Sequence, residues 1–231
     1  MQIAGLVKSS LIDYPGKVAA VVFTQGCNFR CGFCHNPDLI GIENTEFRIQ
    51  TDEVLDFLKT RVGKLDGVVV TGGEPLIQPD IEEFIAEIKN IGFAVKLDTN
   101  GSNPKKLSRL IDLKLIDYIA MDIKGPLAKY ADICAYPNTK VIQQSIKIIM
   151  KSGLPYEFRT TVLPKYHNVS DFALIGKLID GAKLYTIQGF RSQITLDPGL
   201  ADAKSFGPEE LKEIANTITP YVKKVIIHEN S

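Results

Sequence analysis

The sequence has no long hydrophobic run and no excess of charge of one sign. No apolar stretch approaches the roughly 20 residues that a membrane-spanning helix needs, and the first eight residues are too polar and too short for a signal peptide. Lysine plus arginine number 27, as do aspartate plus glutamate, so the formal net charge is zero. A neutral chain has no general attraction to nucleic acid or to an anionic membrane. We therefore expect a cytoplasmic protein without a nucleic-acid or membrane partner.

Low-complexity segments and linkers are also missing, which argues against division into several domains. The 231 residues suit one domain of ordinary size, and 45% hydrophobic residues are ample for a core. We expect a single domain over residues 1–231, with a core at about 17–190 and a C-terminal helix and strand within 207–228.

Short apolar runs rich in β-forming residues alternate with amphipathic segments along the chain. The predicted strands are residues 19–24, 68–71, 94–99, 118–122, 156–162 and 184–189, with 225–227 as an extra one. Helices are predicted at 80–90, 105–113 and 141–151, after caps at Thr51 and Ser170, and from Gly207 onward.

This alternation favours right-handed βαβ units and a parallel sheet. Six units are fewer than the eight of a closed barrel, so we expect an α/β fold, an open (βα)6 partial TIM barrel. A flat doubly wound sheet is the alternative. In either architecture, functional side chains belong at the carboxyl ends of the strands.

Three of the four cysteines, Cys27, Cys31 and Cys34, follow the first predicted strand with the spacing CxxxCxxC. Three thiolates can hold three irons of a cubic [4Fe–4S] cluster and leave the fourth iron open, whereas clusters normally take four cysteines. A zinc site closed by His35 is one alternative, and a set of inert buried thiols is another. The glycines and polar residues around the cysteines argue against burial.

Polar motifs follow the next three strands. Gly72 and Gly73 would let a ligand approach the backbone, and Glu74 adds a carboxylate; a tight turn into a helix is the alternative. The segment Asp98-Thr99-Asn100 offers oxygen ligands, with a simple turn as the alternative.

Two further motifs carry charge at strand ends. Asp122 and Lys124 alternate and so share one face, where a plain salt bridge is the alternative. Arg159 shares a face with Glu157 and Thr161, and its five donors suit a carboxylate. An internal ion pair with Glu157 or Asp122 is the alternative for Arg159.

Outside these motifs, four residues receive simpler interpretations. Phe29 and Phe33 would shield the cysteines, with stacking against an adenine ring as the alternative. Cys134 is expected to be an incidental thiol, with a redox or partner-contact role as the alternative. His167 is expected to be a surface residue in a loop.

The cysteine segment, Cys-Asn-Phe-Arg-Cys-Gly-Phe-Cys-His-Asn-Pro, resembles the signature of the radical S-adenosylmethionine (SAM) enzymes. Within them, it resembles the activating enzymes of glycyl-radical proteins. The opening, residues 3–17, is most similar to the activating protein of anaerobic ribonucleoside-triphosphate reductase.

The resemblance implies a [4Fe–4S] cluster on Cys27, Cys31 and Cys34 that cleaves SAM reductively to a 5′-deoxyadenosyl radical. That radical would install a glycyl radical on a partner enzyme, an anaerobic ribonucleotide reductase. Because no second cysteine cluster is present, electrons would come from a flavodoxin- or ferredoxin-like donor.

The resemblance also implies a SAM site at the strand ends. Its members would be Gly72, Gly73, Glu74, Asp98, Asn100, Asp122, Lys124 and Arg159. Asp98, Thr99 and Asp122 would hold a monovalent cation there. Gln188 stands where some activases have a histidine that contacts the nucleoside.

Three other functions stay open. One is activation of pyruvate formate-lyase or another glycyl-radical enzyme. A second is radical SAM chemistry on a small molecule, as in a 7-deazapurine synthase, a class that tends to have a different spacing between its first two cysteines. A third is an iron–sulfur or zinc binding module, which would leave the strand-end motifs without a purpose.

Overall fold

The computed structural model describes residues 1–41 and 48–229, and these form one sheet of eight strands in sequential order. The strands are β1 (Ile3–Ser10), β2 (Ala19–Thr24), β3 (Gly67–Gly72), β4 (Ala94–Thr99), β5 (Tyr118–Asp122), β6 (Tyr156–Val162), β7 (Tyr185–Gly189) and β8 (Val225–His228). All neighbouring strands are parallel except β1 and β2, which are antiparallel.

Helices connect the parallel strands. They are α1 (Thr51–Lys59), α2 (Ile81–Ile91), α3 (Pro104–Asp112), α4 (Tyr130–Cys134), α5 (Thr139–Lys151), α6 (Val169–Leu178) and α7 (Pro208–Ile218). Among the described residues, no helix combines the length and apolar character needed to cross a bilayer.

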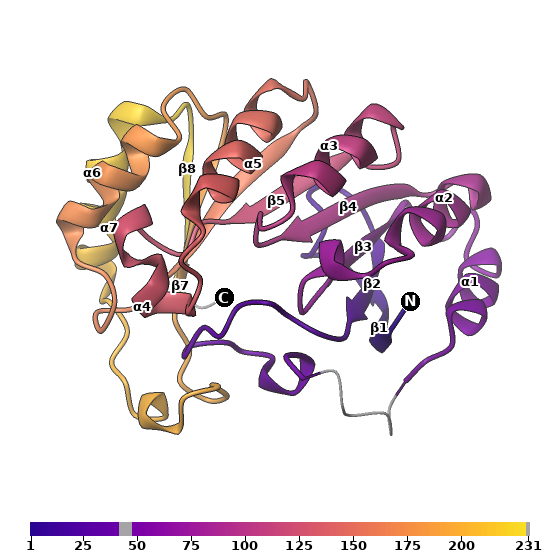
Figure 1. Ribbon diagram of the computed structural model, residues 1–231, viewed down its shortest axis with the longest axis horizontal. Coiled ribbons are helices and arrows are strands. Elements are labelled where there is room, and N and C mark those ends of the chain that lie inside the picture. The colour runs from indigo at the N-terminus through magenta and orange to yellow at the C-terminus, as the bar shows by residue number, and fades with distance from the viewer. Residues whose placement is uncertain (42–47, 230–231) are drawn as a thin grey trace.

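Sequential strand order decides between the two predicted architectures. Right-handed crossovers that always advance in the same direction place their helices on one face of the sheet. Helices α1, α2, α3, α5 and α6 accordingly cover the outside of a curved sheet, whose other face is concave (Figure 1). The open partial barrel is therefore confirmed, and the doubly wound alternative is wrong because the strand order never reverses.

The concave face has its own small apolar core. Val21, Val69 and Tyr118 point into it from three strands, and Tyr14 joins them from the connection between β1 and β2. The Tyr14 ring lies 6.0 Å from the Tyr118 ring, and only 3% of Tyr14 is exposed. Tyr14 thus fills the barrel interior near the start of the strands and leaves their carboxyl ends open.

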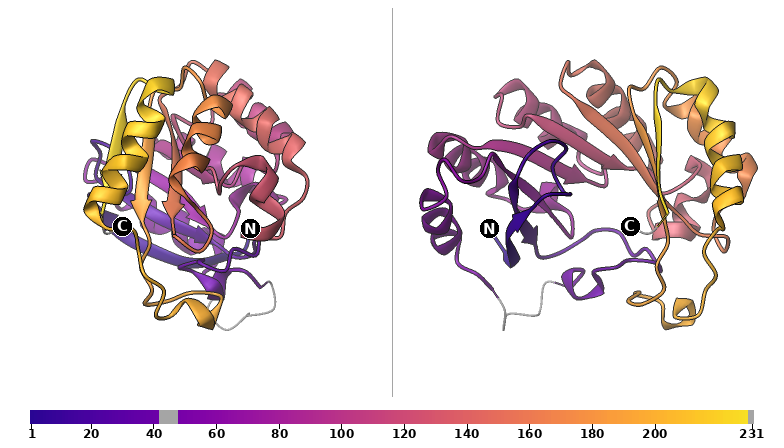
Figure 2. Two further views of the ribbon diagram at one scale, coloured as in Figure 1. Left: turned by 90° about the vertical axis from the view of Figure 1, so that its left-hand side faces the viewer. Right: turned by 180° about the vertical axis from the view of Figure 1, so that it is seen from behind.

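Strand β1 was not predicted. It pairs with β2 along the edge of the sheet, and its outer residues are half-exposed or exposed. The mixed, half-buried composition of Ile3–Ser10 lacks the continuous apolar run by which the inner strands are recognised. The two views in Figure 2 show this strand beside β2 at one edge of the curved sheet.

Both predicted helix caps are wrong by one or two residues. Gln50 occupies the N-cap of α1, without a side-chain hydrogen bond. Asn168 caps α6: its side chain accepts from the Asp171 N–H, and Asp171 accepts from the Asn168 N–H in return. The Ser170 hydroxyl only donates to the Asn168 side chain. A reciprocal capping box satisfies two backbone donors, which explains why Asn168 is preferred.

Candidate active site

An open cavity of about 800 Å³ lies at the carboxyl ends of the parallel strands. It brings together the cysteine loop after β2 and the polar ends of four further strands. Its lining includes Cys27, Cys31, Cys34, Thr71, Gly72, Gly73, Asp98, Thr99, Asn100, Asp122, Lys124 and Arg159. All predicted site residues except Glu74 therefore line one cavity, as expected for a barrel of this kind.

The cysteine loop is attached at three points. The Gly26 N–H donates to the Leu39 carbonyl at 2.7 Å, and the Glu74 N–H donates to the Gly26 carbonyl at 2.8 Å. On the far side, the Arg30 N–H donates to the Cys134 carbonyl at 2.9 Å. The loop thus spans from the end of β3 to α4 across the open side of the barrel (Figure 1).

Gly73 is required for the attachment at β3. A Cβ atom at this position would lie 1.9 Å from the Gly26 carbonyl oxygen, far inside van der Waals contact. The second glycine of the predicted motif therefore serves the packing of backbone on backbone, in addition to lining the cavity.

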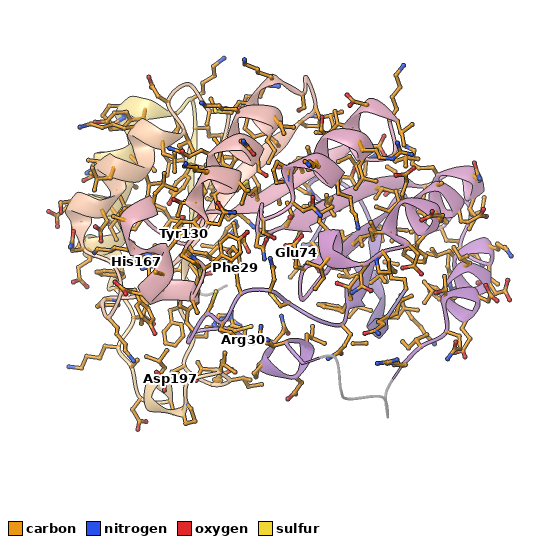
Figure 3. The ribbon with its side chains drawn as sticks, viewed as in Figure 1. Phe29, Arg30, Glu74, Tyr130, His167 and Asp197 are labelled. Atoms are coloured by element: carbon orange, nitrogen blue, oxygen red, sulfur yellow. The ribbon has the colours of Figure 1, made fainter. Side chains whose placement is uncertain are left out.

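Aromatic rings pack behind the cysteines. Phe29 is 2% exposed and lies 6.4 Å from the Tyr130 ring and 4.5 Å from the Tyr136 ring. Figure 3 shows Phe29 beside Tyr130. Phe33 is also buried and lies 5.7 Å from the Tyr166 ring. These contacts agree with a shielding role for both phenylalanines.

The thiols are less exposed than the sequence suggested. Cys31 is buried, while Cys27 and Cys34 are half-buried. Burial raises the pKa of Cys27 to about 11 and also raises the pKa of Cys34. The neighbouring Cys134 thiol and burial raise the pKa of Cys31. Binding of metal at these positions would release protons, as thiolate ligation requires.

A zinc site closed by His35 is not formed. In the part of the chain that the structure describes, no three Cys, His, Asp or Glu side chains converge as ligands of a single ion. His35 instead stacks on Phe190, with 5.8 Å between the ring centroids, and its Nε2 bonds with the Arg191 carbonyl at 3.1 Å. A cluster needs a wider set of thiols than one zinc ion, since each cysteine binds a different iron.

Across the cavity, Arg159 bridges two carboxylates. Its Nε donates to Asp122 Oδ1 at 2.9 Å, and its Nη1 lies 3.2 Å from Asp98 Oδ2. Lys124 Nζ lies 3.2 Å from the other Asp122 oxygen. The ion pairs considered for Asp122 with Lys124 and with Arg159 are therefore both present, within the wall of the cavity.

This network controls ionisation. Burial alone would raise the pKa of Asp122, but the charges of Arg159 and Lys124 outweigh it and hold that pKa at about 2. The same carboxylates raise the pKa values of Arg159 and Lys124 against the effect of burial. At neutral pH the cavity thus presents fixed charges of both signs, which suit a ligand that carries an ammonium and a carboxylate group.

Glu74 differs from expectation. Its side chain is completely buried behind the cavity wall and accepts hydrogen bonds from Leu76 N–H, Thr99 Oγ1 and Asn100 N–H. Pro75 begins a short 3₁₀ turn after it, as the turn interpretation required. Figure 3 shows Glu74 on the opposite side of Phe29 from Tyr130. Glu74 therefore positions the ends of β3 and β4 and does not face the cavity.

Asn100 receives its orientation from this contact. Its backbone is held by Glu74, and its side-chain Nδ2 donates to Asn28 Oδ1 at 3.0 Å and lies 4.0 Å from Cys27 Sγ. The end of β4 is thus joined to the cysteine loop through one amide side chain.

Three residues near the site have buried positions that the sequence did not indicate. His167 is 3% exposed, so the surface expectation is wrong; its Nδ1 accepts from Leu163 N–H and its Nε2 donates to the Lys124 carbonyl at 2.8 Å. Cys134 is fully buried, and its thiol donates to the Tyr130 carbonyl at 3.1 Å. Lys96 is 2% exposed and pairs with Asp98. The signal for such a position in the sequence is a lysine inside an apolar strand.

The thiols and charged side chains that line the cavity fit an iron–sulfur cluster and SAM. Three thiols that are too dispersed for one ion share a cavity with charged groups able to hold an amino-acid moiety. Gln188, which was considered as a replacement for a histidine of some activases, is not among the residues that line this cavity, whereas His35 is.

Comparison with known proteins agrees with this geometry. A family model described as the radical SAM superfamily matches residues 21–179. A protein of Methanocaldococcus jannaschii, MJ1227, assigned provisionally as a glycyl-radical enzyme activating enzyme, is 34% identical over 234 residues. The match covers 97% of this chain and 95% of that protein. This chain belongs to the radical SAM superfamily, among its glycyl-radical enzyme activating enzymes.

A second relative and a solved structure are also similar to this radical SAM chain. The pyruvate formate-lyase-activating enzyme of Staphylococcus aureus is 33% identical over 172 residues, which cover 69% of this chain and 67% of that enzyme. The crystal structure of Streptococcus suis SuiB bound to S-adenosylmethionine has a TM-score of 0.66 at 14% identity. It covers 88% of this chain and 48% of SuiB, so the chain spans about half the length of that structure. The radical SAM chain is an enzyme whose family uses a [4Fe–4S] cluster and SAM.

Proposed function

We propose that this radical SAM enzyme installs the glycyl radical of an anaerobic ribonucleoside-triphosphate reductase. The observation that carries the activase part is the shared cavity, in which three thiols face the charged pair of Asp122 and Arg159. The relative from Methanocaldococcus jannaschii, similar over nearly the whole chain, supports a glycyl-radical enzyme as the partner.

The residues of the cavity divide by chemistry. Cys27, Cys31 and Cys34 would hold three irons of the cluster. Gly72, Gly73, Asp98, Asn100, Asp122, Lys124 and Arg159 form the SAM site, and Glu74 positions Asn100 from behind. Arg159 binds the carboxylate of SAM, because its guanidinium already bridges two carboxylates and offers a planar set of donors.

When bound, the cluster and SAM supply one chemistry: an electron from an external donor breaks a C–S bond of SAM to give methionine and a 5′-deoxyadenosyl radical. This radical would take a hydrogen atom from a glycine Cα of the partner, which would leave 5′-deoxyadenosine and a glycyl radical. The chain itself binds the reactants, orients them with its fixed charges and covers the cysteines with Phe29 and Phe33. A flavodoxin- or ferredoxin-like protein supplies the electron.

The choice of the reductase rests on residues 3–17, which resemble the reductase-activating proteins. Pyruvate formate-lyase is the second candidate partner, and the Staphylococcus aureus relative supports it. That match covers about two thirds of each chain.

The experiment compares the two partners directly. Anaerobically reconstituted enzyme, reduced and supplied with SAM, is mixed with the reductase or with pyruvate formate-lyase, and protein radicals are counted by electron paramagnetic resonance. We expect a doublet on the reductase, which collapses when the partner's glycines are deuterated, with deuterium recovered in 5′-deoxyadenosine. Cys34→Ser, which lacks a cluster ligand, should give no radical. A doublet only on pyruvate formate-lyase would reassign the partner, and turnover of a small metabolite without any protein radical would refute the activase function.

A further inference from the structure

Lys96 is a buried cation that lies behind Asp98, a residue of the candidate SAM site. Its side chain is 2% exposed, and its Nζ lies 2.5 Å from Asp98 Oδ1. It also lies 5.9 Å from the centroid of the Tyr118 ring, a distance typical of a cation–π contact. Lysine is almost never fully buried unless it is paired, because removing an ammonium from water is costly. The pairing with Asp98 offsets this cost, so the two charges form a buried unit beside the cavity.

The position of Lys96 follows from strand geometry. Residues two apart on a strand point to the same face, so Lys96 and Asp98 both face the concave interior. The neighbouring strand repeats the arrangement in reverse order, with Lys124 two residues after Asp122 and 3.2 Å from it. Each carboxylate thus has an ammonium of its own from the same segment of chain.

The oxygens predicted to hold a monovalent cation already have protein donors. Asp98 Oδ1 binds Lys96 and Asp98 Oδ2 binds Arg159. Asp122 Oδ1 binds Arg159 and Asp122 Oδ2 binds Lys124. All four carboxylate oxygens therefore lie within 3.2 Å of a cationic nitrogen.

The remaining predicted ligand is also engaged. The Thr99 hydroxyl donates to Glu74 Oε1 at 2.7 Å and accepts from the Gly101 N–H at 3.1 Å. A cation would have to displace these protein contacts to find oxygen ligands. The residues present do not fit a separate monovalent cation.

We infer that the ammonium of Lys96 serves in this chain as the built-in counterpart of that cation, so that SAM binding needs neither Na⁺ nor K⁺. Among the described residues, Arg159 alone pairs with both carboxylates. If the SAM carboxylate recruits Arg159, Asp98 still keeps Lys96 and Asp122 still keeps Lys124. The buried carboxylates then remain paired throughout binding, which avoids the cost of an unpaired charge.

The test measures SAM binding by cluster-loaded enzyme in NaCl, KCl and choline chloride at one ionic strength. Choline is too large to enter a site built for Na⁺ or K⁺. The wild-type dissociation constant should agree within about twofold in the three salts. Lys96→Met removes the charge and keeps a side chain of similar length. It should weaken binding by about tenfold or more in choline chloride and recover much of the loss in NaCl or KCl.

A second readout does not involve SAM. The melting temperature of cluster-loaded Lys96→Met should rise when choline is replaced by Na⁺ or K⁺, whereas that of the wild type should not. Lys96→Arg keeps the charge and should behave like the wild type. Lys89→Met is the control, because Lys89 on α2 pairs with Asp117 at 2.8 Å, and Asp117, unlike Asp98, does not line the cavity. It should show no dependence on the cation.

The inference rests on SAM as the ligand, and the two can fail separately. A wild-type affinity that rises by about fivefold or more with Na⁺ or K⁺ would overturn the role of Lys96, whatever the variants do. A loss in Lys96→Met that is equal in all three salts, or no loss at all, would also overturn it. Absence of SAM binding by wild-type enzyme in every salt would instead refute the cofactor assignment, and this inference with it.

Discussion

The carboxylate of Glu74 accepts a hydrogen bond from the backbone N–H of Asn100, with 2.6 Å between Oε2 and the nitrogen. Its other oxygen accepts from the Thr99 hydroxyl at 2.7 Å and from the Leu76 N–H at 3.0 Å. One buried side chain thus joins the end of β3 to the end of β4. The motif that sequence assigned to direct ligand contact acts in this structure by holding its neighbours.

Burial raises the pKa of Glu74 to about 7, although its three hydrogen bonds oppose the shift. The folded protein therefore keeps this proton between about pH 4.5 and 7, where the unfolded chain loses it. The free energy of unfolding should fall as pH rises through that range, by up to about 3 kcal/mol from this group. Glu74→Gln does not titrate, so urea unfolding of both proteins at several pH values should show a stability difference that changes below about pH 7 and is constant above it. A difference independent of pH would contradict the assignment.

Arg159 should control SAM affinity without controlling the cluster. Removing one partner of a buried charged network typically costs about 2–5 kcal/mol, so Arg159→Met should weaken equilibrium SAM binding by about thirtyfold or more. Arg159→Lys keeps the charge but cannot bridge both carboxylates. Its SAM affinity should therefore lie between those of the wild type and Arg159→Met. Both variants should keep four irons per chain.

Arg109→Met is the control for Arg159, because Arg109 pairs with Glu82 on the surface. It should leave SAM affinity unchanged. Wild-type affinity in Arg159→Met would show that SAM binds elsewhere.

Cys134 should be dispensable for the cluster. Its thiol is buried and donates to the Tyr130 carbonyl, while Cys27, Cys31 and Cys34 line the cavity. Cys134→Ala should retain four irons and four sulfides per chain after anaerobic reconstitution and lose only about 1 kcal/mol of stability. Cys31→Ala should lose the cluster. Loss of iron in Cys134→Ala would make the fourth cysteine a ligand and overturn the three-cysteine assignment.

His167 should give the opposite pH dependence to Glu74. Burial lowers the pKa of His167 below its ordinary value of 6.5, since the fold favours the neutral ring that accepts from Leu163 and donates to Lys124. The unfolded chain takes up a proton below about pH 6.5 and the folded protein does not, so stability should fall as pH decreases through this range. In His167→Gln that loss should disappear, as measured by urea unfolding from about pH 7 to 5. An unchanged acid dependence in the variant would show that His167 is not the group responsible.

Much of the fold follows from local sequence. Strands β2, β4, β5 and β6 begin and end where the sequence predicted. Strands β2 and β5 are nearly continuous apolar runs, as expected for strands covered on both faces. The left-handed Gly92 ends α2 as expected. Strand β1 was not predicted, because an edge strand is defined by its pairing partner. The N-cap of α6 is Asn168 and not Ser170, and the sequence did not distinguish them because both residue types can cap a helix.

The candidate site divides in the same way. The sequence by itself determined the three clustered thiols and the order of polar residues at the strand ends, since these depend on spacing along the chain and on the direction of parallel strands. Only the tertiary structure decided that Glu74 points behind the wall, that His167 is buried, and that Lys96 and Arg159 share the carboxylate of Asp98. Those outcomes depend on which distant groups meet in a water-poor interior, where every buried charge or polar atom must find a partner. The spacing of residues along the chain does not predict which of these distant groups pair.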